Sequence, residues 1–132
     1  MNEPSILLNL LPGDVRLKQL NTKKIKPTKK AKPYYSTKWQ YKIVNFDERK
    51  LELLAYVDTI LDGMFEMKVC FEVDYKLRVA MEEDEIHKNI TDILYYTATN
   101  YTLLSSFISN FMFGITIPVS PNIQSSDISI LT

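Results

Sequence analysis

The segment from Phe65 to Val79 alternates apolar and polar side chains over 15 residues. Large apolar residues hold the odd positions: Phe65, Met67, Val69, Phe71, Val73, Tyr75, Leu77 and Val79. The even positions are polar except for Cys70. A period of two is typical of a β-strand with one buried face. A strand of this length extends about 50 Å at ~3.3 Å per residue, so the rest of the chain must supply an equally long apolar surface to cover it.

The length and composition indicate one folded domain, residues 1–132. A chain of 132 residues builds one hydrophobic core but not two. Hydrophobic residues make up 45% of it, which argues against disorder. A single cysteine, Cys70, excludes an internal disulfide and a cysteine-based zinc site. No apolar run reaches about 18 residues, and the apolar cluster from Ser5 to Leu11 lacks the basic start and length of a signal sequence. We therefore expect a soluble, cytoplasmic protein.

The formal net charge is zero, but the charges are unevenly divided along the chain. Residues 1–46 carry ten Lys or Arg and two acids, a net charge of +8. Residues 47–132 carry six Lys or Arg and fourteen acids, a net charge of −8. Such a chain is suited either to binding a polyanion with one half or to neutralising itself within an oligomer.

The chain pattern predicts four strands. They cover Val15–Leu20, Trp39–Ile43, Leu51–Leu61 and Phe65–Val79. The segment Leu51–Leu61 fits both strand and helix spacing, and we predict a strand because Asp62-Gly63 is the favoured two-residue hairpin turn. Around these strands we expect an N-terminal arm at 1–12 that closes with a turn at Pro12-Gly13-Asp14, a basic loop at 21–36 and a flexible tail at 122–132.

A long helix follows the strands. Four acids, Glu82 to Glu85, suit its positive N-terminal end, and Gly114 is a plausible C-terminal stop. The expected apolar stripe recurs every three or four residues: Ile86, Ile90, Ile93, Thr97, Tyr101, Leu104, Ile108 and Phe111. Four strands followed by one helix predict an α+β fold, with a four-stranded antiparallel sheet and one long C-terminal helix packed on it.

No residue pattern points to catalysis. His87 is the only histidine, and it lies beside the acidic run that starts the helix. Cys70 has no activating histidine nearby in sequence, no glycine-rich loop is present, and the acids at 82–85 lack the spacing of a calcium loop. We expect no enzyme activity, no metal site and no cofactor.

Two features favour binding. The basic loop carries six lysines, with Tyr34, Tyr35 and Trp39 close by, and can hold a nucleic-acid backbone or simply keep a sheet edge in solution. Lysine without arginine is a poor base reader. The segment from Tyr95 to Phe113 places aromatic residues on more than one helix face. A single sheet covers one face, so the alternatives are a second subunit, an apolar ligand or ordinary core packing.

From about Asp14 to Asn122 the order of these parts resembles the SecB-like chaperones. The matching segments are "DVRLKQL", "STKWQYKIV", "LELLAYVDTILDGMFEMKVCFEVDY", "DILYYTATNYTLLSSFISNFM" and "ITIPVSPNI". The resemblance implies a tetramer built as a dimer of dimers, with long grooves that bind unfolded polypeptide without ATP. One departure is Lys76-Leu77-Arg78, which replaces the family's glycine-rich stretch and predicts that the fourth strand continues through it.

The resemblance also assigns residues. The client-binding positions it implies are Tyr34, Tyr35, Trp39, Tyr41, Ile43, Phe107 and Phe111, with sheet core as the alternative for Trp39 and Tyr41. We expect an oligomer interface, in a dimer or tetramer, at Tyr101, Leu104 and Ile108.

The predicted function is an ATP-independent holdase for unfolded client protein or an antitoxin. Family members devoted to export hand clients to the SecA motor through an acidic sheet face, whereas the N-terminal half of this chain is basic. That difference favours relatives that guard an antitoxin, with an export chaperone and a nucleic-acid-binding module as alternatives.

Overall fold

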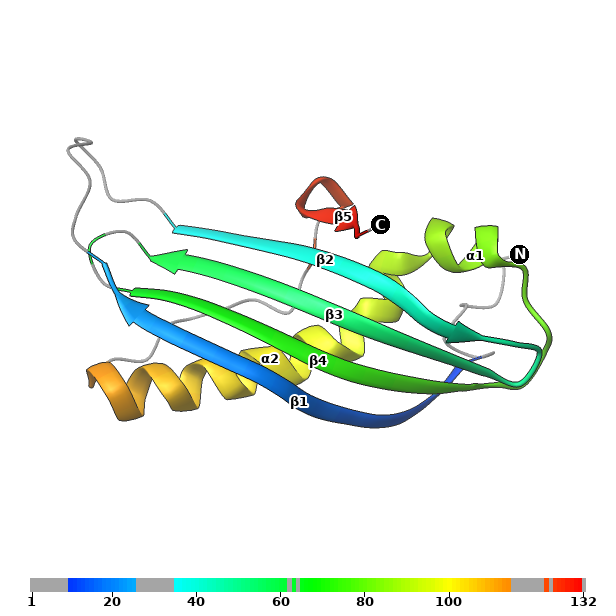
Figure 1. The fold of residues 1–132 in the computed structure, drawn as a ribbon, viewed down its shortest axis with the longest axis horizontal. Helices are drawn as coiled ribbons and strands as arrows, with labels where there is room; N and C mark the ends of the chain where they lie inside the picture. Colours follow the sequence, from blue (N-terminus) through cyan, green and yellow to red (C-terminus); the bar gives the residue numbers. More distant parts are fainter. Residues whose placement is uncertain are drawn as a thin grey trace, which may run out of the picture.

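A computed structural model describes residues 10–25, 35–61, 63, 65–114, 123 and 125–131 of the chain. Over these residues it forms a sheet in the order β1-β4-β3-β2-β5, and a long helix crosses one face of the sheet obliquely (Figure 1). The elements are β1 (Leu10–Lys24), β2 (Tyr35–Phe46), β3 (Lys50–Leu61), β4 (Phe65–Leu77), α1 (Glu83–Lys88), α2 (Ile90–Phe113), the 3-10 turn η2 (Ser125–Asp127) and β5 (Ile128–Ile130). The predicted α+β class, with antiparallel main strands, is confirmed.

The centre of the sheet is the hairpin of β3 and β4. Buried and half-buried positions alternate along β3 and most of β4, as a period of two requires, so the strand prediction for Leu51–Leu61 is confirmed. β4 ends at Leu77, short of the predicted Val79. Leu61 pairs with Phe65, so three positions rather than two connect the strands, and Gly63 among them has a φ of 78°. A positive φ is easily adopted by glycine because it has no Cβ.

β1 is longer than the predicted strand and takes in both of its flanks. It pairs antiparallel with β4 from Leu10 to Lys24, with register shifts between Pro12 and Val15 and between Leu17 and Gln19. The Pro12-Gly13-Asp14 signal is therefore a bulge within an edge strand and not a turn. The expected arm at 1–12 loses its last three residues to β1, and β1 and β2 shorten the expected 21–36 loop from both ends. Residues 1–9 and 26–34 lie outside the described residues.

A fifth strand corrects the expectation of a four-stranded sheet and a flexible tail. β5 runs parallel to β2, with Ile128 opposite Trp39 and Ile130 opposite Tyr41. The backbone N–H of Leu131 donates to the carbonyl of Tyr41 at 2.8 Å. Three residues are too few to show a periodic pattern, so this strand could not be predicted from the sequence.

The predicted single helix is broken at Asn89. α1 begins at a capping box in which Glu82 and Glu85 satisfy each other's backbone N–H groups. Asn89, with φ −110° and ψ 21°, ends α1, and its side-chain amide donates to the carbonyl of Glu85 at 2.8 Å. The break lies in the backbone angles of Asn89 itself, because Asn100 donates to the carbonyl of Tyr96 in the same way without interrupting α2. The predicted stop at Gly114 is confirmed, because its φ is 71° and its N–H donates to the Asn110 carbonyl.

The helical segment crosses the sheet from β2 to β1. At one end a 2.6 Å hydrogen bond joins the Tyr41 hydroxyl of β2 to Nδ1 of His87 in α1. At the other end the Thr22 hydroxyl of β1 lies 3.5 Å from the sulfur of Met112 in α2. In the middle, Tyr101 is fully buried on the core face. No helix in the described part of the chain has the length and hydropathy to cross a bilayer.

Candidate functional site

The face of α2 that meets the sheet differs from the predicted apolar stripe in the second half of the helix. Ser105 and Ser109 are buried there, whereas Phe111 is 81% exposed. The two serine hydroxyls donate to the carbonyls of Thr102 and Ser106 in the same helix, so burying them leaves no hydroxyl unpaired. Small residues let the helix approach the sheet closely. Of the large apolar residues in this half, Leu103, Phe107 and Phe111 are exposed, whereas Leu104 and Ile108 are half-buried against the core.

The exposed residues form an apolar stripe, which we call the α2 ridge. It consists of Tyr96, Leu103, Phe107 and Phe111, spaced by seven, four and four residues and so on one side of the helix. The last three are 69%, 65% and 81% exposed. The rings of Phe107 and Phe111 stack with centroids 6.0 Å apart and planes 9° from parallel. The two rings thus form one flat apolar surface in contact with solvent.

The α2 ridge is also uncharged. Asp92 is the one Asp, Glu, Lys, Arg or His between Ile90 and Phe113. The third side of the helix is polar, with the hydroxyls of Thr99 and Thr102 donating to carbonyls one turn back. A helix exposed to water on two sides ordinarily carries charges there, so an uncharged apolar ridge is typical of a binding surface.

The predicted client-binding residues fall into two groups. Phe107 and Phe111 are exposed on the α2 ridge. Trp39 and Tyr41 are 4% and 5% exposed and belong to the core, the alternative weighed for them from sequence. The Trp39 ring meets Tyr101 edge-on at 5.8 Å.

The remaining predicted client positions give less information. Ile43 is half-buried against the core. Tyr34 lies outside the described residues, and only the backbone of Tyr35 is described. Which of these positions contact a client stays a prediction.

The predicted interface residues also separate. Tyr101 is fully buried, hydrogen-bonds to the Thr59 hydroxyl, and meets Phe71 edge-on at 6.3 Å. Leu104 and Ile108 are half-buried, and at about 100° per residue they lie between the buried face of α2 and its exposed ridge. Leu104 and Ile108 are therefore accessible to a second subunit beside the α2 ridge, whereas Tyr101 is buried in the core and is not.

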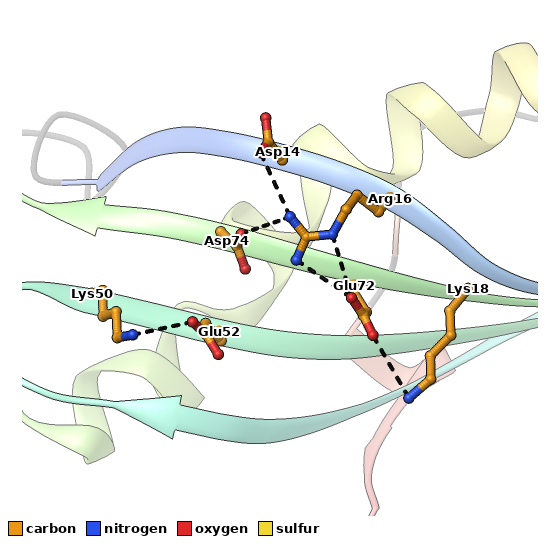
Figure 2. Close-up of polar contacts among 7 residues, drawn as sticks. All are labelled: Asp14, Arg16, Lys18, Lys50, Glu52, Glu72 and Asp74. Atoms are coloured by element: carbon orange, nitrogen blue, oxygen red, sulfur yellow. Dashed lines mark hydrogen bonds and ion pairs between the residues drawn. The ribbon is translucent and has the colours of Figure 1, made fainter.

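The outer face of the sheet, opposite the helix, is covered by ion pairs (Figure 2). Arg16 of β1 reaches Asp74 at 3.1 Å and Glu72 at 3.4 Å, and Lys18 reaches Glu72 at 3.7 Å. Lys50 pairs with Glu52 at 3.3 Å. The basic first part of the chain therefore neutralises part of the acidic remainder within one subunit, across the β1–β4 pair.

The outer face also carries a hollow of about 510 Å³ beside the 126–129 segment. Asp58 and Cys70 are among its lining residues. The Oδ1 atom of Asp58 is buried without a hydrogen-bond partner among the described residues, and burial raises the pKa of this carboxyl. Burial also raises the pKa of the Cys70 thiol, which makes the thiolate rarer and the cysteine less reactive.

The chemistry of a metal or acid–base site does not assemble in the described residues. No three His, Cys, Asp or Glu side chains come together there in a way that could hold a metal ion. His87 is engaged with Tyr41, and its Nε2 lies 3.7 Å from Glu83. The Tyr41 contact joins α1 to β2, and the Glu83 contact lies within α1.

Comparison with known proteins gives the fold class. No protein-family model matches the sequence, and no curated protein matches it. Among solved structures, the chain is similar to Rv1957 of Mycobacterium tuberculosis, a SecB-like chaperone in complex with a ChAD peptide from the Rv1956 HigA1 antitoxin. The TM-score is 0.68 at 9% identity, over 90% of this chain and 91% of that chain.

A protein of unknown function from Streptococcus agalactiae is also similar, with a TM-score of 0.56 at 10% identity, over 84% of this chain and 96% of that chain. Long antiparallel strands crossed on one face by a long helix are thus an arrangement that this chain shares with solved proteins. The particular fold is SecB-like.

Proposed function

We propose that this protein is an ATP-independent chaperone, a holdase that binds unfolded or partly folded polypeptide and releases it without chemistry. The observation that carries the proposal is the α2 ridge, an uncharged apolar surface on a SecB-like fold. Burial of apolar area contributes ~25 cal/mol per Å², less the free energy of ordering the client. Modest binding at several places suits a protein that must let its client go.

The proposed client is an antitoxin segment, and the proposed setting is the cytoplasm. The solved SecB-like chaperone Rv1957 holds a peptide from an antitoxin, which supports this choice. On this chain, Phe107 and Phe111 would contact the client, and Tyr34, Tyr35 and Ile43 remain proposed contacts, whereas Trp39 and Tyr41 are buried in the core. Leu104 and Ile108 would contact a second subunit in a homo-oligomer.

The outer face of the sheet argues against the export alternative. The resemblance assigns export to members with an acidic sheet face. Here Glu66 lies 3.6 Å from Lys23 and 3.3 Å from Lys68, and the acids at 52, 72 and 74 are also paired with Lys or Arg. A face neutralised in this way offers little net charge to a cationic partner.

The test is suppression of aggregation, with reduced and carboxymethylated lactalbumin as an unfolded competitor for the site. Wild-type protein at stoichiometric amounts should slow the aggregation of a heat-denatured client. The double variant Phe107→Ser/Phe111→Ser should lose most of this effect, because it removes the exposed stacked pair. Val79→Ser is the matched control, since Val79 is 57% exposed but lies off α2.

Two further measurements make the result specific. Light scattering on the double variant separates loss of client surface from loss of assembly. A gel shift across salt tests the nucleic-acid alternative, because lysine-driven binding weakens steeply as salt rises. Unchanged aggregation with wild-type protein would contradict the proposal.

A further inference from the structure

The backbone edge of β2 is a part of the sheet that the proposed side-chain contacts do not use. β2 has 12 residues, and only the three from Trp39 to Tyr41 pair with β5. Within the described residues, the stretch 42–46 has no strand on that side. An edge of this length presents backbone N–H and C=O groups to any extended chain, which is how many proteins bind peptides.

β5 holds this edge weakly. It is three residues long and parallel to β2, in a sheet whose other strands pair antiparallel, and parallel pairs are slightly less stable per residue. Ile128 is half-buried against the core, whereas Ser129 is exposed and Ile130 is 50% exposed. One apolar anchor and a few backbone hydrogen bonds, including that from Leu131 to Tyr41, therefore retain the strand.

The segment also stands away from the outer face of the sheet. Residues 126–129 line the hollow of about 510 Å³ together with residues of the outer face, so they are not packed tightly on it. Trp39 and Tyr41 are held from the other side by Tyr101 and His87. β5 can therefore leave without opening the main core.

We propose that the β2 edge is a strand-addition site for an extended client segment, and that residues 128–130 occupy it as a displaceable placeholder. The inference rests on the proposed function and names the backbone mode of client binding. The occupant runs parallel to β2 and carries an aliphatic residue, then a small polar residue, then an aliphatic residue, as Ile128-Ser129-Ile130 do. Beyond Tyr41 it continues past Val44, which is 54% exposed.

The test removes one backbone donor from the placeholder. Leu131→Pro deletes the N–H that reaches the Tyr41 carbonyl, and Leu131→Ala is the matched control that keeps it. The probes are unfolded carboxymethylated lactalbumin and a fluorescein-labelled peptide with the sequence of residues 125–131. Circular dichroism melts establish that both variants fold.

Both probes should bind Leu131→Pro about three- to tenfold more tightly than wild type or Leu131→Ala, the factor that one net hydrogen bond in the competing strand is worth. A peptide N-methylated at its leucine should bind all three proteins more weakly by a similar factor, because it lacks the N–H that the Tyr41 carbonyl accepts. Equal affinities for the three proteins, with client binding by wild type intact, would overturn the inference alone. Self-association of Leu131→Pro without tighter probe binding would overturn it too, because β5 would then only cover the edge.

If no variant binds the unfolded polypeptide, the proposed function fails. The affinities for the labelled peptide still show whether the β2 edge accepts an added strand. Tighter peptide binding by Leu131→Pro would then retain strand addition without a chaperone role. Equal peptide binding would remove both.

Discussion

The charged form of the Asp58 carboxyl is disfavoured in the folded protein, because the group is partly buried. Burial raises the pKa of its carboxyl and Glu66 raises it further, while Lys68 on β4, Lys38 on β2 and Lys23 on β1 lower it. Because the folded-state pKa lies above the unfolded value, the folded protein binds this proton more tightly. Its contribution to stability is therefore present at low pH and is lost as pH rises through the two pKa values.

Asp58→Asn should accordingly raise the free energy of unfolding at pH 7, but by less than about 1 kcal/mol, because the carboxyl is only half-buried and solvent and nearby lysines screen its charge. At pH 4.5 the gain should shrink. Urea denaturation at both pH values measures it, with the exposed Glu48→Gln as control. An equal gain at both pH values would show that shape, and not charge, is responsible.

Single residues also show where sequence reasoning stops. The period of two places Trp39 and Tyr41 on one face of β2, but it does not say whether that face meets the core or a groove. Tyr101 decides this for Trp39, because its ring packs against the indole from a distant part of the chain. Leu103, the ridge residue that sequence analysis missed, had the helical spacing from Tyr96 and Phe107 as its signal.

At the scale of elements, the long segments with a clear apolar period could be predicted. The short strand β5, the rotation of α2 and the break between α1 and α2 could not. β3, β4 and the helical region follow from periods of two and 3.6. The rotation of α2 does not, because the sequence pattern assumes that large side chains face the core, whereas Ser105 and Ser109 do so here. The break at Asn89 is a change in the backbone angles of one residue, which the spacing of the apolar residues does not record.

Gly114 offers a clean test of how α2 ends. Its φ of 71° is strained for a residue with a Cβ, yet among the described residues, apart from its chain neighbours and the helix's own backbone, no atom lies within 4 Å of the position a Cβ would take. Gly114→Ala should therefore destabilise the protein by about 1 kcal/mol through the backbone alone. Gly114→Asn should cost less, since asparagine tolerates this conformation. Urea denaturation compares the three proteins, and equal stability of all three would mean that the end of α2 unwinds freely.

At the scale of the molecule, the opposite charges of the two parts of the chain meet within one subunit, so charge alone does not require a partner. The pairs of Arg16, Lys18 and Lys23 with acids of β4 show this directly. What the subunit does not satisfy is apolar surface on α2. The need for a partner therefore rests on the α2 ridge. The excess of aromatic residues predicts such a surface, but the sequence does not show which side of α2 is exposed.

This surplus predicts assembly. Light scattering of the wild-type protein should give a mass that is a multiple of the 15.4 kDa subunit, because a stable interface needs on the order of 1,200 Å² and α2 is the longest exposed apolar element described. Leu104→Lys places a charge on a half-buried residue of the proposed subunit interface, so it should lower the mass toward one subunit, with circular dichroism used to check that the variant folds. Val79→Lys, 57% exposed and away from α2, should leave the mass unchanged. A wild-type mass of one subunit, or an unaltered mass in a folded Leu104→Lys, would show that this side of α2 does not join subunits.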